Sequence, residues 1–203
     1  MHRDIKPANL FVTRLGSEYD YLKVLDFGIV KDQPGADATQ LSAQNLLQGT
    51  PAFMAPEIVL GEAYDHRVDI YAVGCVAYWL LTGKLVFEGE SSVKVMLDHA
   101  QVVPPPPHTR TELSIPPELE QVVMDCLEKA RDRRPGSAAE LARRLAACPT
   151  PQPWTCERAE RWWHTHLPEH SVARPVADVL LSRESSPPRG RELRAVPRRV
   201  VTR

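Results

Sequence analysis

Cysteine is scarce in this sequence, and no two cysteines form a familiar motif. Four occur among 203 residues, at positions 75, 126, 148 and 156, and none belongs to a Cys-x-x-Cys pair. This spacing implies neither a disulfide framework nor a zinc site. A reduced setting is the simplest expectation, and we predict a cytoplasmic location.

Long apolar runs are also lacking. The longest run, IYAVGCVAYWLL, follows Asp69 and stops at Thr82, whereas a helix needs about 20 apolar residues to cross a bilayer. The charged N-terminus has no apolar core of the kind found in a signal peptide. We therefore expect no membrane segment in this chain, and we predict that residues 68–81 form a buried core helix.

The sequence has no excess of charge of either sign. Lys and Arg total 25, and Asp and Glu total 26, so no net field attracts the chain to nucleic acid or to an anionic membrane. The Arg-rich end, RGRELRAVPRRVVTR, leaves nucleic-acid binding open as an alternative, but a solvated tail is the simpler interpretation. We expect no nucleic-acid partner, and the sequence predicts no particular oligomeric state.

The apolar pattern predicts a mainly α-helical fold with a short β-hairpin region. Strands are expected at 10–13 and 21–25, joined by RLGSEYD, and residues 31–50 read as a long loop. Helices are expected over 68–81, over 91–99, within PPELEQVVMDCLEKA and within SAAELARRLAAC. In the last of these, Ser137 and Glu140 have the spacing of a capping box.

Proline marks two further segments. The run Pro104–Pro107 forbids a helix and is expected to be a rigid connection, with a polyproline ligand as the alternative. Past Pro149 the composition changes, which predicts a first domain over 1–148 and a largely irregular Pro/Arg-rich tail over 149–203. The tail contains one possible short helix, CERAERWWHTH. Three histidines in and beyond it raise a metal site as an alternative to an amphipathic surface helix, which is favoured: His164, His166 and His170.

The most reactive stretch lies at the start of the chain. His2-Arg3-Asp4-Ile5-Lys6-Pro7-Ala8-Asn9 places a carboxylate, an ammonium and an amide within six residues, and Asp26-Phe27-Gly28 adds a second carboxylate after the next hairpin. Phosphoryl transfer needs this set, because it requires a proton acceptor, a cation for the moving phosphoryl group and oxygen ligands for Mg²⁺.

Three motifs in order carry a resemblance to a known family. HRDIKPAN, DFG and GTPAFMAPE resemble the catalytic loop, metal loop and activation-segment end of a protein kinase. HAQVVPPPP is similar to the same region of bacterial serine/threonine kinases, and RDRRPGSAAEL resembles the last two helices of the C-terminal lobe. The resemblance covers 1–148, roughly three quarters of the chain, and implies a kinase-like C-terminal lobe of the α+β class.

The resemblance implies a role for each residue at the chemical centre. Asp4 would accept or align the proton of a Ser/Thr hydroxyl on a protein substrate, and Lys6 would contact the γ-phosphate of ATP. Asn9 and Asp26 would hold Mg²⁺, and Thr50 would bond Asp4 and Lys6 next to the substrate. Lysine two residues after the catalytic aspartate is typical of serine/threonine kinases.

Further residues are expected to support this centre. Glu57 and Arg134 should form a buried pair, and Asp69 should accept the backbone N–H groups of the His2-Arg3 turn. Phe27 and Gly28 belong to the metal loop by resemblance. Arg3 suggests regulation by a phosphate on the long loop, for which the candidate acceptors are Thr39 and Ser42.

The family's ATP-binding half, with its glycine-rich loop, strand lysine and helix glutamate, has no counterpart in these 203 residues. We expect Met1 to be an internal methionine of a longer kinase. The isolated chain should bind Mg²⁺ and ATP weakly and have negligible activity, and an apolar face of helix 68–81 should be exposed. The alternative function is a non-catalytic kinase-like module that docks substrates or competes with an intact kinase.

Overall fold

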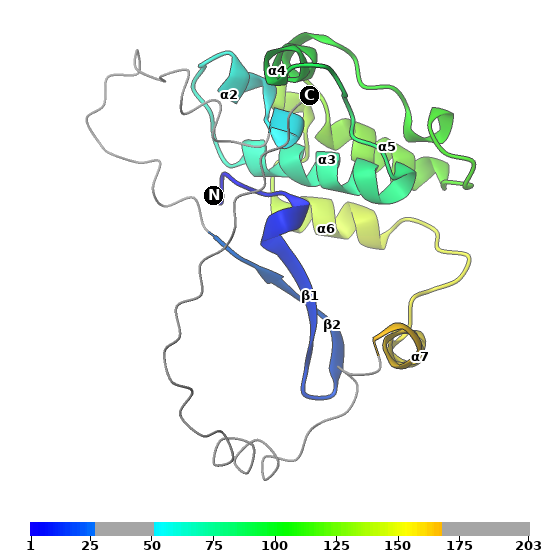
Figure 1. Cartoon of the computed structure of the whole chain (residues 1–203). Helices are drawn as coiled ribbons and strands as arrows, with labels where there is room; N and C mark the ends of the chain where they lie inside the picture. The colour runs from blue at the N-terminus through cyan, green and yellow to red at the C-terminus, as the bar shows by residue number, and fades with distance from the viewer. Residues whose placement is uncertain (27–50, 168–203) are drawn as a thin grey trace, which may run out of the picture. The chain divides into compact units, whose positions relative to one another are not determined.

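The computed structural model describes residues 1–26 and 51–167, and it divides the chain into two compact units, Met1–Cys156 and Glu157–Arg203. The sequence places a domain boundary slightly earlier, at 148/149. The described part of the first unit is rich in helix and contains a two-stranded antiparallel sheet (Figure 1), in agreement with the predicted mixture.

The elements of the first unit follow one another in a simple order. The 3₁₀ turn η1 (Pro7–Asn9) leads into strands β1 (Leu10–Leu15) and β2 (Glu18–Val24). After the undescribed segment come η3 (Pro51–Phe53), α2 (Pro56–Val59), α3 (Arg67–Thr82), α4 (Ser92–Gln101), η4 (Pro107–Thr109), α5 (Pro117–Cys126), η5 (Arg131–Arg133) and α6 (Ala138–Ala146). The second unit begins within α7 (Cys156–His166), the short helix expected from CERAERWWHTH.

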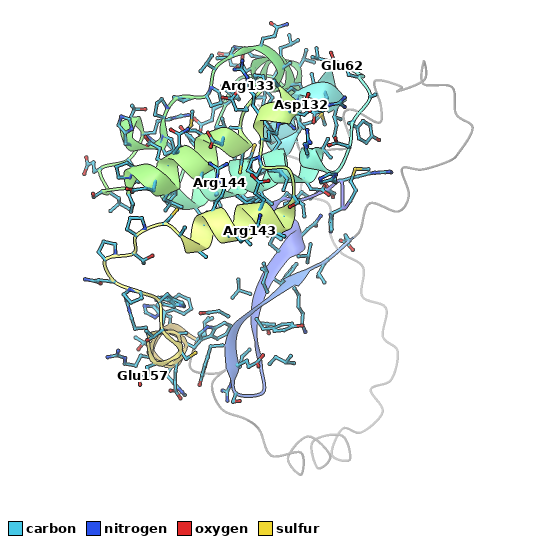
Figure 2. All side chains as sticks on the ribbon, turned by 180° about the vertical axis from the view of Figure 1, so that it is seen from behind. Glu62, Asp132, Arg133, Arg143, Arg144 and Glu157 are labelled. Carbon is cyan, nitrogen blue, oxygen red and sulfur yellow. The ribbon has the colours of Figure 1, made fainter. Side chains whose placement is uncertain are left out.

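Helix α3 is the centre of the core, as its nearly continuous apolar sequence predicts. It lies beside α5, which lies beside α6 (Figure 1). One buried cluster joins α3 to the α5 end and to the segment before α4: Ala55, Val68, Tyr71, Cys75, Tyr78, Val86, Phe87, Val123 and Leu127. A second cluster joins α3, α5 and α6 through Ile70, Val122, Cys126 and Leu141. An ion pair between Arg144 of α6, labelled in Figure 2, and Asp125 of α5 ties the two helices at the surface.

Gly74 allows the close approach of α3 and α5. A Cβ atom at this position would lie 2.7 Å from Cβ of Cys126 and 3.2 Å from Cδ2 of Leu127. Alanine has the higher helix propensity, but at this position the steric clash would destabilise the fold by more than the gain in propensity stabilises it.

Gly74→Ala should therefore lower the free energy of unfolding by about 1–3 kcal/mol, measured by urea denaturation. Gly89→Ala is the matched control, because a Cβ there would meet its nearest neighbour at 3.4 Å, an ordinary contact. Equal losses of stability in the two variants would contradict close packing at Gly74.

The hairpin differs from the prediction in its turn. The strands extend to Leu15 and from Glu18, so only Gly16 and Ser17 separate them, not the seven residues of RLGSEYD. Gly16 has φ 61°, which glycine adopts without strain. The polar side chains within 18–20 favoured a loop in the sequence prediction. Backbone pairing at an exposed hairpin does not require apolar side chains, so the strand begins earlier than predicted.

Two helix ends show details that the sequence did not predict. Helix α5 ends at Cys126, inside the predicted range, where the N–H groups of Leu127 and Glu128 bond the carbonyl groups three residues earlier, at Met124 and Asp125. At α6, the Ser137 hydroxyl accepts from the Glu140 N–H (3.1 Å), as predicted. The Glu140 carboxylate, however, accepts from the N–H of Gly136 (2.9 Å), so the second bond is displaced by one residue.

Exposed apolar side chains gather on the hairpin more than on α3. Most of α3 is buried, and only Trp79 and Leu80 near its end are exposed. On the strands, in contrast, Phe11, Val12 and Leu22 are each at least half exposed. The expectation of an exposed apolar face on helix 68–81 is thus wrong for most of that helix, because α5 and the segment before α4 cover it.

In the part of the chain that the structure describes, no helix is both long enough and apolar enough to traverse a bilayer.

Candidate active site

The loop Met1–Asn9 is fixed from beneath by Asp69 in the first turn of α3. Asp69 accepts the backbone N–H of His2 at 2.6 Å and that of Arg3 at 2.7 Å, one with each carboxylate oxygen. These are the two contacts expected from the sequence. Arg3 has φ 71°, an uncommon conformation for a residue other than glycine, and the paired carboxylate bonds hold it there.

The carboxylate of Asp4 lies between a cation and an amide. Its Oδ2 atom is 2.9 Å from Nζ of Lys6 and accepts a hydrogen bond of 3.0 Å from Nδ2 of Asn9. The same Nδ2 donates to the backbone carbonyl of Asp4 at 2.8 Å. Asp4, Lys6 and Asn9 thus form one cluster, in which Asn9 is buried and the two charged side chains remain partly exposed.

The end of β2 is bonded directly to this loop. The N–H of Leu25 donates to the carbonyl of Asn9 at 2.9 Å, and Nε2 of His2 lies 3.0 Å from the carbonyl of Leu25. Because a carbonyl only accepts, Nε2 carries the proton, and Nδ1 is then able to accept the N–H of Asp4 at 3.3 Å. These bonds place Asp26, which follows Leu25, beside the loop that carries Asp4. Asp26 is exposed and has φ 54°.

The expected pair of Glu57 and Arg134 is present and almost fully enclosed. Nη1 and Nη2 of Arg134 each donate to one oxygen of Glu57 at 2.7 Å. The remaining donors of Arg134 reach the carbonyl groups of Glu128, Lys129 and Arg67. All five N–H groups of the guanidinium are therefore used.

Five of the predicted site residues lie outside the described residues: Phe27, Gly28, Thr39, Ser42 and Thr50. Arg3, which was linked to a phosphate on the long loop, lies with its guanidinium carbon 6.0 Å from the ring centre of Tyr64. Phosphate regulation stays a prediction.

Sequence reasoning missed a buried polar network in the helical core. The hydroxyl of Tyr71 lies 2.8 Å from Nδ1 of His99, a fully buried residue, and the ammonium of Lys129 donates to the carbonyl of His99 at 2.7 Å. Lys129 also lies 4.8 Å from the ring centre of Phe87, and that ring meets His99 edge-on. No local sequence pattern predicts these contacts, because Tyr71, His99 and Lys129 come from separate segments.

Burial governs the protonation of this network. Burial, assisted by the charge of Lys129, lowers the pKa of His99 from 6.5 to about 4. Burial likewise lowers the pKa of Lys129 from 10.5 to about 8. Near neutral pH the imidazole is neutral and the ammonium is charged, which suits the bonds that each makes.

Because His99 is neutral in the folded state, we expect the free energy of unfolding to fall in acid. The unfolded chain binds this proton near pH 6.5 and the folded chain only near pH 4, so the stabilisation is complete above pH 6.5 and is lost as the pH falls toward 4. Between about pH 7.5 and about pH 5 the free energy of unfolding should fall by about 2 kcal/mol from this group alone. Urea denaturation at the two pH values measures the fall. In His99→Gln the fall should be smaller by that amount, and an unchanged pH dependence would exclude His99 as its source.

Among the described residues, no three or more His, Cys, Asp or Glu side chains come together as a metal-binding group. Of the three histidines raised as a metal site, His166 lies 2.9 Å from the carbonyl of Trp162 and His164 pairs with Glu160, contacts within α7 itself. His170 lies outside the described residues.

Comparison with known proteins identifies the class of protein. The family model described as protein kinase domain matches residues 1–145, and the chain belongs to this family. The chain is 37% identical over 186 residues to serine/threonine-protein kinase pkn3 of Myxococcus xanthus, an alignment covering 88% of this chain and 34% of that protein.

Two other relatives carry names of the same kind. Serine/threonine-protein kinase Pkn1 of Myxococcus xanthus is 40% identical over 145 residues, covering 71% of this chain and 20% of that protein. Serine/threonine-protein kinase PknB of Mycolicibacterium smegmatis is 40% identical over 143 residues, covering 70% and 22%. The chain thus spans about a third or less of the length of these relatives.

Proposed function

We propose that the chain is the catalytic, C-terminal lobe of a serine/threonine protein kinase, which transfers the γ-phosphoryl group of ATP to Ser/Thr hydroxyls of proteins. The observation that carries the proposal is the cluster of Asp4, Lys6 and Asn9, held on a loop that Asp69 fixes to the central helix. The family match over 1–145 and the names of the relatives support the same reaction class.

Each member of the cluster has a distinct task. Asp4 accepts the proton of the substrate hydroxyl as the oxygen attacks the γ-phosphorus, and its bond to Asn9 fixes the direction of the carboxylate. Lys6 places its ammonium beside Asp4, where it balances negative charge on the transferred phosphoryl group. Thr50 is assigned to the substrate side of the cluster by resemblance.

Asn9 and Asp26 are the residues that would hold Mg²⁺. Asn9 uses its Nδ2 for both bonds to Asp4, so its amide oxygen is the atom assigned to the metal, and Asp26 contributes a carboxylate from the strand end bonded to Asn9. Hard oxygen donors of this kind suit Mg²⁺, which takes its other ligands from water and nucleotide phosphates. When bound, the ion neutralises charge on those phosphates.

The proposal includes a cytoplasmic location, since the reaction needs ATP. It also includes the expectation that the 203 residues alone bind nucleotide weakly, because an ATP-binding lobe supplies most contacts to adenine and phosphates in this family.

A transfer assay tests the proposal. The 203-residue chain alone, and the same chain joined behind an ATP-binding lobe of the family, are incubated with Mg²⁺, γ-labelled ATP and Ser/Thr peptides. We expect label on the peptides from the joined protein and little from the 203 residues alone. A joined protein that is folded and binds ATP but transfers no label would overturn the proposal.

The exposed apolar side chains of the hairpin favour a second candidate, the non-catalytic docking module. This candidate predicts capture of an intact kinase or its substrate by the 203-residue chain, with no dependence on the carboxylate of Asp4.

A further inference from the structure

The hairpin that connects the proposed metal ligands is joined to the catalytic loop at its base. Its strands pair mainly with each other and with η1, and Phe11, Val12 and Leu22 are exposed on them. At that base, the N–H of Leu25 donates to the carbonyl of Asn9, and the carbonyl of Leu25 accepts from the ring of His2. A two-stranded hairpin on its own is only marginally stable in water. A second point of attachment would therefore affect its orientation.

The structure supplies such a point near the tip. The indole N–H of Trp154 donates to Oδ2 of Asp20 at 2.5 Å, across 134 positions of sequence. Asp20 has φ 58° and lies next to the register shift of the hairpin, between Thr13 and Leu15. Aspartate is one of the few residues other than glycine that adopts this conformation readily, and here its carboxylate is an acceptor for the downstream chain.

The segment Cys148–Thr155, termed the strap, is suited to hold this contact. At its start Cys148 packs against the cluster of Ile70, Val122, Cys126 and Leu141, and its Sγ donates to the carbonyl of Arg144. Prolines at 149, 151 and 153 fix three φ angles and favour an extended, stiff chain. The strap is thus anchored in the core at one end and on the hairpin at the other.

We propose that the strap is a positioning element: Trp154, by binding Asp20, holds the β1–β2 hairpin in the orientation that sets Asn9 and Asp26 at its base. Asn9 precedes β1 directly, and Asp26 follows β2 after Leu25, so a movement of the hairpin moves both groups relative to the loop that carries Asp4 and Lys6. The metal-binding role of these two residues rests on the proposed function, whereas the mechanical link does not. Trp154 acts on the reacting groups through the hairpin.

Residue-resolved amide hydrogen exchange on the full 203-residue chain tests the link without nucleotide. Trp154→Phe removes the donor but keeps an aromatic ring, and Asp20→Gly removes the acceptor at a position whose φ glycine tolerates. Both should accelerate exchange of the amides of residues 21–24 and of Leu25, whose N–H bonds Asn9, by about three- to tenfold. Amides of α3 and α5 should exchange as before, which shows that the core is intact.

Two controls separate positioning from general destabilisation. Trp162→Phe changes a similarly exposed tryptophan of α7 and should leave β2 and Leu25 unchanged. Asp20→Asn keeps an oxygen acceptor and should retain most of the protection. The proposal is wrong if Leu25 exchange is unaffected by Trp154→Phe, if Trp162→Phe has the same effect, or if α3 is accelerated equally. Since no phosphoryl transfer is measured, failure here leaves the kinase proposal intact, and failure of the transfer assay leaves the strap intact.

Discussion

Asp4→Asn should reduce phosphoryl transfer by about 10²–10⁴-fold in a form of the protein that has an ATP-binding lobe. Asparagine is nearly the same size and still offers an oxygen to Nδ2 of Asn9. It has no basic oxygen to accept the proton of the attacking hydroxyl, so the loss should fall on the turnover rate. Initial rates of label transfer to a Ser/Thr peptide at saturating ATP measure it.

The control for this substitution is Asp132→Asn. This substitution makes the same chemical change at Asp132, labelled in Figure 2. The side chain of Asp132 is largely exposed and pairs with Arg67. We expect its activity to stay within about twofold of the parent, because exposed ion pairs contribute little to stability. If Asp4→Asn retained more than about a tenth of the activity while binding ATP normally, Asp4 would not be the proton acceptor.

Lys6→Ala separates the two roles within the cluster. The ammonium of Lys6 lies 2.9 Å from Asp4, so its removal leaves the acid in place but takes away the cation that pairs with it here. If charge balance in the transition state is its task, Lys6→Ala should lower turnover more than it weakens peptide binding. A change confined to KM for the peptide would instead assign Lys6 to substrate binding.

The sequence predicted the parts of this molecule that depend on local pattern. The apolar run after Asp69 predicted α3 to within a residue at each end, and the motif order placed Asp69 beneath the His2-Arg3 turn and Glu57 opposite Arg134. A motif predicts a long-range contact only where the resemblance to a family also says which residue is the partner. The local sequence pattern around Glu57 and around Arg134 does not by itself indicate that the two side chains meet.

Contacts with no motif behind them could not be predicted. His99 reads as one polar residue in an amphipathic helix, and only the packing of Phe87, Tyr71 and Lys129 around it makes it a buried neutral base. Trp154 reads as a tryptophan in a proline-rich tail, yet it bonds a strand near the other end of the chain.

The buried pair of Glu57 and Arg134 should have the largest effect on stability. Arg134→Met leaves the carboxylate of Glu57, whose side chain is only 5% exposed, without its two charged hydrogen bonds. Removing one partner of such a pair costs about 3–5 kcal/mol. It also frees the carbonyl groups of Glu128, Lys129 and Arg67 from their donor. Urea denaturation monitored by tryptophan fluorescence measures the loss.

A double-mutant cycle distinguishes the charge from the packing. Glu57→Gln with Arg134→Met removes both charges, so the double variant should be more stable than the sum of the two single losses predicts, by about 1–3 kcal/mol. Because α2 and the segment after α5 are joined by this pair, its loss should loosen the chain that follows Pro51 before it affects the Asp69 contacts. Strict additivity would mean that the two side chains stabilise the fold independently, in conflict with their paired hydrogen bonds at 2.7 Å.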